Sequence, residues 1–251
     1  MKLVTLGTSH GDPTALRFCS SNALEINGDV YIIDAGAPID ALYIRKYTND
    51  FSKVRAIFIT HMHDDHIGGL PGFIKELVKY AKEGQHTHIY LPENVEQVLC
   101  AWLRAMHVNK IDRFITFHVI RVGEIYKDKN VCVSAVGTNH IPSDADPLTF
   151  AFFFKAKGKT LFYSGDLACD FSDFPLDDLK KNGADLCVCE CTHYDPYVAL
   201  EVFEQLPIKK MLFNHVGNRN ATEEGANRWK EVFKKCNFTC TIAHDGDEYY
   251  V

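Results

Sequence analysis

The sequence lacks a surplus of positive charge, an apolar run long enough to cross a bilayer, and any internal repeat. Its 27 Lys and Arg residues are outnumbered by 33 Asp and Glu residues, and the formal net charge is −6. Proteins that grip nucleic acid through its phosphates usually carry a basic surplus, so general duplex binding is disfavoured, although a local basic rim remains compatible with this composition. Because a membrane helix needs roughly 20 apolar residues, no membrane partner is expected.

Low-complexity tracts, charge blocks and linker-like segments are also missing, so residues 1–251 are expected to form a single domain. The hydrophobic share of 46% and the aromatic share of 12% exclude disordered, collagen-like and coiled-coil classes. The segment Met1–Gly7 turns polar too early for a secretory signal peptide.

A disulfide framework is not expected either, since the cysteine count is nine. Cys187, Cys189 and Cys191 alternate along one apolar run, so they share one face of a predicted strand. Neighbouring cysteines of that kind indicate reduced thiols and a cytoplasmic location. A CxCxC metal site is the sharper alternative, but buried cysteine commonly behaves as a small hydrophobe, and we favour that role.

Short runs rich in Val, Ile, Phe and Tyr, bounded by Gly, Asp or Asn, predict many β-strands. The expected strands are 2–6, 23–26, 30–33, 54–59, 88–91, 115–120, 131–135, 149–154, 160–163, 186–190, 211–214, 238–242 and 248–251. Glycine placement predicts hairpin turns at residues 27–29 and 157–159.

Helical periodicity lies between these strands, at residues 70–82, 93–107 and 222–235. Pro92 is expected to open the second helix and Thr222 to cap the third. Hairpins come first, then strand–helix alternation, and the same order follows again. That order favours an α/β fold with two mixed sheets and helices outside them, a four-layer αββα sandwich.

The strongest motif is Thr60-His61-Met62-His63-Asp64-Asp65-His66, directly after the strand 54–59. Its spacing is not that of ligands on a helix, and it suits a turn that leaves a strand. His61 and His63 can then converge on one ion, while Asp65 and His66 face a second position. Neutral imidazoles and carboxylates are ligands for zinc or a comparable first-row metal.

Three further polar residues each follow an apolar strand: His140, Asp166 and His244. Ligands gather beyond the carboxyl ends of strands in open α/β sheets, so these side chains fit the same metal site as the histidine motif. Asp34 and Asp64 are candidates for fixing the histidine tautomers, with a strand-end turn and a helix cap as equally good alternatives.

Together, these residues resemble the metal-binding set of the metallo-β-lactamase fold superfamily, in order and over nearly the whole chain. The resemblance implies an αββα sandwich with a two-metal site, zinc being favoured and manganese or iron possible. It assigns His61, His63 and His140 to the first ion, Asp65, His66 and His244 to the second, and Asp166 to a bridging position.

Within that superfamily the chain is most similar to the ribonuclease Z-like phosphodiesterase branch. The similar segments are Leu6–Thr14, Tyr31–Gly36, Ala184–His193, Asn214–Arg219 and Ala243–Gly246. By this resemblance the catalytic residues are Asp65, Glu190 and His215, with Glu190 orienting His215 and His215 protonating the leaving oxygen. Ribonuclease Z normally carries a long arm for transfer RNA before the bridging Asp. Here only residues 141–165 separate His140 from Asp166, and transfer RNA is therefore not expected as a partner.

The sequence thus predicts a hydrolase with two divalent ions, acting on a small nucleotide or a cyclic phosphodiester. A metal-held hydroxide would attack phosphorus, and a general acid would protonate the leaving group. Two alternatives stay open: a carboxyl-ester, thioester or lactone hydrolase on the same metals, and a non-catalytic domain that metal stabilises. A homodimer is also possible by the resemblance.

Overall fold

The computed structural model describes the backbone of residues 1–251 and every side chain except those of Arg219 and Ala221. The Arg219 side chain at the end of the expected histidine loop therefore lies outside the described residues. The chain divides into two compact units. Unit 1 comprises Met1–Ile120 and Asp245–Tyr250, and unit 2 comprises Arg121–His244 and Val251.

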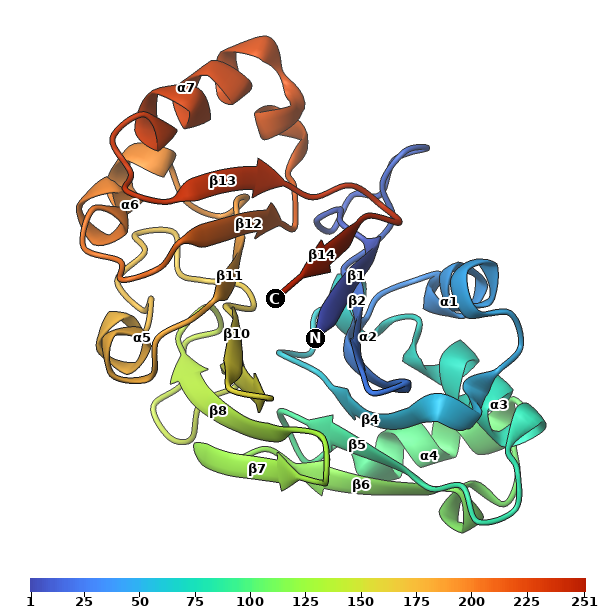
Figure 1. Ribbon diagram of the computed structural model, residues 1–251. Helices are drawn as coiled ribbons and strands as arrows, with labels where there is room; N and C mark the ends of the chain where they lie inside the picture. Colours follow the sequence, from blue (N-terminus) through green and yellow to red (C-terminus); the bar gives the residue numbers. More distant parts are fainter. The chain divides into compact units, whose positions relative to one another are not determined.

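Unit 1 is built on a seven-stranded mixed sheet in the order β14-β1-β2-β3-β4-β5-β6 (Figure 1). Its strands are β1 (Lys2–Gly7), β2 (Ser21–Ile26), β3 (Asp29–Ala35), β4 (Val54–Phe58), β5 (Thr87–Leu91), β6 (Ile115–Val119) and β14 (Glu248–Tyr250). Pairs from β14 to β3 are antiparallel, and pairs from β3 to β6 are parallel. Asn27 and Gly28 both have positive φ at the β2–β3 turn, as the predicted hairpin requires.

Helices of unit 1 pack against one face of this sheet. They are α1 (Ile39–Tyr47), α2 (Asp64–Ile67), α3 (Leu70–Tyr80) and α4 (Glu96–Ala105), with 3₁₀ turns at Phe51–Lys53 and Ile111–Arg113. The apolar stripe of α3, including Phe73 and Leu77, joins a buried cluster with Ile32 and Ile57 of the sheet. Burial of such side chains is the main stabilising contribution, at about 1.5–3 kcal/mol each.

Unit 2 has a second seven-stranded mixed sheet, in the order β13-β12-β11-β10-β9-β8-β7. Its strands are β7 (Gly123–Lys127), β8 (Cys132–Thr138), β9 (Thr149–Ala156), β10 (Lys159–Tyr163), β11 (Leu186–Glu190), β12 (Lys210–Asn214) and β13 (Thr239–Ile242). The pairs from β7 to β10 are antiparallel, and those from β10 to β13 are parallel.

The helices of unit 2 are α5 (Leu176–Asn182), α6 (Pro196–Phe203) and α7 (Glu223–Phe233), with a 3₁₀ turn at Asn218–Ala221. Phe203 of α6 and Trp229 of α7 share a buried cluster with Cys187, Cys189 and Cys191. The apolar role favoured for these cysteines is therefore confirmed. Burial raises the pKa of the Cys189 thiol to about 12, which keeps it protonated and unreactive.

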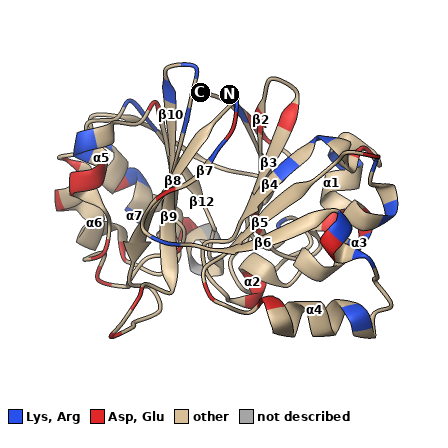
Figure 2. Cartoon of the chain, turned by 90° about the horizontal axis from the view of Figure 1, so that it is seen from below, with Lys and Arg blue, Asp and Glu red and all other residues tan. Residues whose placement is uncertain are grey.

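Charged residues follow the helix dipoles at several ends. Figure 2 shows acidic residues at the start and basic residues at the end of α5, where Asp177 and Asp178 precede Lys180 and Lys181. Thr222 caps α7 as expected, its hydroxyl accepting the Gly225 N–H at 3.1 Å. No helix in the described part of the chain is both long and apolar enough to cross a bilayer.

Several features differ from expectation, among them helices α1, α5 and α6, which were not predicted. Pro92 does not open a helix, because α4 begins only at Glu96, after a turn closed by the Val95 N–H and the Glu93 carbonyl. Strand β7 was not predicted: its GEIYK sequence is largely exposed and carries little apolar signal. Otherwise the expected strands are present, and the α/β class with two mixed sheets and helices is confirmed.

Candidate metal-binding and catalytic residues

In unit 1, the histidine motif begins where parallel strand β4 ends. His61 is buried, and its Nε2 lies 2.9 Å from Nδ1 of His63. His63 is in extended conformation just before α2, whose first turn holds Asp64 and Asp65. The chain therefore turns between His63 and Asp65, as the spacing predicts, and the two imidazoles converge on one point.

Asp34 fixes the orientation of His66. This carboxylate sits fully buried at the end of β3, and its Oδ2 lies 2.8 Å from His66 Nδ1. The Thr60 N–H donates to Asp34 Oδ1 at 2.8 Å and holds the carboxylate in place. An Nδ1–H bonded to Asp34 leaves the Nε2 lone pair of His66 for a metal, and that Nε2 lies 3.5 Å from Asp65 Oδ2. Of the two alternatives that the sequence leaves open for Asp34, these contacts support the orienting role.

Gly36 allows the backbone to approach Asp65 closely. A Cβ at this position would lie 2.0 Å from the Asp65 carbonyl oxygen and 2.7 Å from Cys19 Cβ. No side chain fits there, so the glycine is required for the position of Asp65. Asp64, by contrast, is exposed in the first turn of α2, where a carboxylate stabilises the helix.

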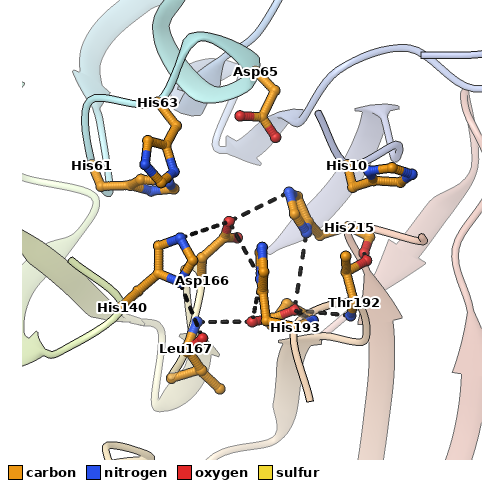
Figure 3. Close-up of polar contacts among 12 residues, drawn as sticks. His10, His61, His63, Asp65, His140, Asp166, Leu167, Thr192, His193 and His215 are labelled. Carbon is orange, nitrogen blue, oxygen red and sulfur yellow. Dashed lines mark hydrogen bonds and ion pairs between the residues drawn. The ribbon is translucent and has the colours of Figure 1, made fainter. Parts of the chain in front are cut away.

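In unit 2, Asp166 is the centre of the cluster. It follows β10 and is buried, and its Oδ2 lies 3.5 Å from His215 Nε2, 3.7 Å from His193 Nδ1 and 3.9 Å from His140 Nε2 (Figure 3). The His140 Nδ1 faces the Leu167 carbonyl at 3.1 Å, so its Nδ1–H is held and Nε2 is directed at Asp166.

Burial lowers the pKa of His140, against an opposing effect of the Asp166 charge. A lowered pKa keeps the imidazole neutral, which is the form that binds metal. Ligand atoms of Asp166, His193 and His215 all lie within 4.8 Å of one another. The donor set in this unit, imidazole nitrogen beside a buried carboxylate, is the chemistry that zinc or a similar first-row ion takes.

Glu190 ends strand β11 and is almost completely buried. Its Oε1 accepts the Leu167 N–H at 2.8 Å, and its Oε2 accepts the N–H groups of Thr192 and His193, each at 2.9 Å. Its side chain also contacts His193 Nδ1 at 2.9 Å, whereas His215 Nδ1 is 4.0 Å away. Among these two imidazoles, Glu190 therefore orients His193 more directly than His215.

His215 follows β12 in a left-handed conformation with φ of 53° and is buried. The Thr192 hydroxyl donates to the His215 carbonyl, and the His215 ring stacks on that of His193 with centroids 5.3 Å apart. These contacts connect the loops after β11 and β12, so the positions of the two imidazoles depend on each other.

Each unit therefore brings its own expected residues together. In unit 1 these are His61, His63, Asp65 and His66, and in unit 2 they are His140, Asp166, Glu190 and His215. His244 is exposed just after β13, and no group of metal-ligating side chains found among the described residues of unit 2 includes it. Sequence reasoning gave His193 only as a substrate contact or a polar loop residue, although its place three residues after the buried Glu190 was a usable signal.

Several known proteins are similar to this chain. A ribonuclease Z of Oenococcus oeni is 37% identical over 150 residues, which are 56% of this chain and 45% of that protein. A ribonuclease Z of Methanocaldococcus jannaschii is 25% identical over an alignment covering 99% of this chain and 96% of that protein. In the first of these, as in others like it, the match spans about half the length of the relative.

Solved structures share the fold. Human tRNase Z, short form, has a TM-score of 0.77 at 20% identity, covering 100% of this chain and 99% of that one. The metallo-beta-lactamase fold protein YhfI from Bacillus subtilis also has a TM-score of 0.77, at 17% identity with 99% of both chains covered. A diphosphatase from the PhnP family has a TM-score of 0.72 at 19% identity, and the match covers 100% of this chain and 97% of that one. These confirm the metallo-β-lactamase fold.

The expected resemblance to the ribonuclease Z-like branch is also confirmed by these relatives. The family profile that matches residues 1–229 is more specific, and its description is Anti-Pycsar protein Apyc1. Since that match includes both the histidine motif and the Asp166 cluster, this chain belongs to the Anti-Pycsar protein Apyc1 family.

Proposed function

We propose that this protein is a metal-dependent phosphodiesterase that cleaves a small nucleotide or cyclic phosphodiester. The observation that carries the proposal is the buried Asp166 carboxylate, with imidazole nitrogens of His215, His193 and His140 at 3.5, 3.7 and 3.9 Å. Relatives named ribonuclease Z and a similar structure named diphosphatase support phosphoester chemistry.

Seven residues would hold two divalent ions, with zinc favoured. His61, His63 and His140 would bind the first ion, Asp65, His66 and His244 the second, and Asp166 both. The convergence of His61 on His63 in unit 1 and of His140 on Asp166 in unit 2 supports this assignment. The assignment of His244 rests on the family resemblance alone. Because the ligands come from both units, we propose that residues 1–251 work as one catalytic domain.

When bound, the ions would lower the pKa of a coordinated water and neutralise charge on the phosphate. The chain itself has to supply a proton to the leaving oxygen. We assign that step to His215, which is buried beside Asp166 and stacked on His193. Glu190 would then act mainly as a positioning residue, since its hydrogen bonds hold the loop and the ring of His193.

A short substrate is supported by the segment before Asp166. Residues Thr149–Tyr163 form the β9–β10 hairpin, whose strands pair directly across the turn at residues 157–158. That leaves only residues 139–148 as a loop, and the net charge of −6 does not favour a long polyanion. We therefore propose a short diester as the substrate. Transfer RNA is the competing candidate, because relatives of this chain are named ribonuclease Z.

We also propose a cytoplasmic location, supported by nine free cysteines, of which Cys187, Cys189, Cys191 and Cys19 are buried. Dimerisation stays a prediction from the resemblance. Light scattering of the purified chain would test it, and the mass of a single 28.4 kDa chain would contradict it.

The decisive experiment compares substrates on the metal-loaded chain. Cyclic nucleotides, dinucleotides, a bis-aryl phosphate, a transfer-RNA precursor, thioesters and lactones are assayed with Asp166→Asn as the inactive reference. Cleavage of the short diesters, lost in the variant, supports the proposal. Turnover of only thioesters or lactones, or of only the transfer-RNA precursor, contradicts it.

A further inference from the structure

A second group of histidines lies on strands β5 and β6 of unit 1. His86 directly precedes β5, His88 belongs to it, and His118 belongs to β6. His86 and His88 share one face of the sheet because they are two residues apart. The parallel register places Thr116 opposite His88 and Tyr90 opposite His118, so His118 lies diagonally from His88 on the same face.

Two of these imidazoles, those of His88 and His118, are in direct contact, and His86 lies beside them. His88 Nδ1 lies 2.9 Å from His118 Nε2, and the two ring centroids are 5.2 Å apart. The His86 ring lies 5.4 Å from that of His88, and its Nε2 is 2.7 Å from the Thr116 hydroxyl. Tyr90 stacks on His118 at 4.6 Å with an interplanar angle of 14° and fixes its orientation.

Two imidazole nitrogens at 2.9 Å share one N–H between them. If that proton moves to the outer nitrogen of the same ring, both rings stay neutral and two lone pairs face each other. Zinc bonds imidazole nitrogen at about 2.0–2.1 Å, so an ion would fit once the nitrogens separate by a few tenths of an ångström. The same separation of 2.9 Å joins His61 and His63, which the proposed function assigns to one ion.

We propose that His88 and His118 together bind one divalent transition-metal ion of the zinc, copper or nickel type through their facing nitrogens. All-imidazole donors suit these ions and not magnesium or calcium. The site is separate from the His61 motif, because His88 pairs with Ala56 inside β4 whereas His61 lies beyond the end of that strand.

Protonation supports this site. Burial lowers the pKa of His88, with neighbouring imidazoles adding to the effect, and burial also lowers that of His118. The Glu96 carboxylate opposes the shift at His118. Metal ions bind imidazole in its neutral form, which burial of the two rings favours. The ion would join edge strand β6 to β5 and stabilise this edge of unit 1.

The test counts metal ions on the full chain. Wild type, the double variant His88→Gln/His118→Gln and the control His107→Asn are saturated with Zn²⁺, freed of excess by gel filtration, and analysed for zinc per chain. His107 is an exposed histidine at positive φ, a conformation that asparagine also tolerates. The double variant should hold one ion fewer than wild type, and the control should not. Equal counts in all three proteins overturn the proposal.

Activity separates this result from the proposed function. Cleavage of a bis-aryl phosphate should be the same in all three proteins, because neither His88 nor His118 is assigned to catalysis. A lost ion without any diesterase activity in wild type would support this site and contradict the proposed function.

If the double variant does not fold, the wild type still decides the question. Crystals soaked in zinc should show an anomalous scattering peak between the facing nitrogens of His88 and His118. Absence of this peak contradicts the site.

Discussion

Units 1 and 2 follow the same plan, a sheet whose strands pair antiparallel on one side and parallel on the other, yet they present their polar residues differently. Unit 1 places four candidate ligands within one turn, from His61 to His66. Unit 2 places one at a time, at the ends of separate strands: His140 after β8, Asp166 after β10, Glu190 in β11 and His215 after β12. The positions of the candidate ligands thus depend on one local turn in unit 1, and on the register of the whole sheet in unit 2.

The largest effect should come from the centre of unit 2. Asp166→Asn removes the charge that three imidazoles face, and kcat/KM for a phosphodiester should fall by more than about 10³-fold. Asp170→Asn is the matched control, since Asp170 is exposed on the same loop and bonds only to Ser172 in the described contacts. Steady-state kinetics with fully loaded enzyme measure this, and a loss below tenfold would show that unit 2 does not hold the reaction centre.

The next effect distinguishes the two stacked imidazoles. His215→Ala should lower kcat by about 10²–10⁴-fold for a substrate with an alkoxide leaving group, the usual contribution of a general acid. With a nitrophenolate leaving group the loss should be small, because that group needs no proton.

His193→Ala is the comparison in the same assay. Glu190 contacts His193 at 2.9 Å, so this variant should change the pH dependence of kcat more than the value of kcat at its optimum. If His193→Ala shows the strong leaving-group dependence and His215→Ala does not, the roles are reversed and His193 is the acid.

A smaller effect, on zinc affinity, is expected from removing the Asp34 carboxylate that holds His66 in unit 1. Asp34→Asn weakens the hold on His66 Nδ1, and zinc affinity should fall about 10–100-fold, as for other carboxylates behind a metal-bound histidine. Asp64→Asn, at an exposed position in the adjacent helix, should leave affinity unchanged. Competition with a chromophoric chelator measures both, and an equal affinity for the two variants would remove Asp34 from the site.

The smallest effect should come from the cysteines. Cys187→Val keeps a buried apolar side chain in the core of unit 2, so the free energy of unfolding should change by less than about 1.5 kcal/mol. Denaturant unfolding measures this together with the zinc content. Loss of a bound ion in this variant would contradict the apolar role and support the alternative, a metal site formed by Cys187, Cys189 and Cys191.

The same contrast explains how far the sequence could be interpreted. The motif at His61–His66 was predictable because its residues are nearly consecutive, and its spacing fits a chain that leaves a strand and turns into the start of a helix. Grouping His140 with Asp166 rested on the general rule that ligands gather beyond strand ends, and the resemblance added the assignment to particular ions; that β8 and β10 flank β9 in one sheet came only with the structure. His193 was not placed among the ligands or catalytic residues because a single histidine in a loop carries no periodic signal.

Most strands were predictable because buried β-branched and aromatic runs such as Thr149–Phe154 are distinctive. Helices α1, α5 and α6 were not predicted, and each is short; α1 and α5 in particular combine a few buried residues with many charges. Leu179, for example, is completely buried in α5, whereas its neighbours Lys180 and Lys181 are exposed. Tertiary packing, which no local pattern reveals, decides such segments.

The return of the chain to unit 1 has a consequence for synthesis. Strand β14 pairs with β1, and Asp245 accepts the Phe18 N–H and the Thr8 hydroxyl, so the last segment completes the sheet begun by the first. On the ribosome, the N-terminal half emerges with one edge of its sheet still open, and all of unit 2 has to be translated before that edge is covered. An open edge is a place where nascent chains associate wrongly. The last step of cotranslational folding is therefore expected to be the pairing of β14 with β1, the first strand of the chain.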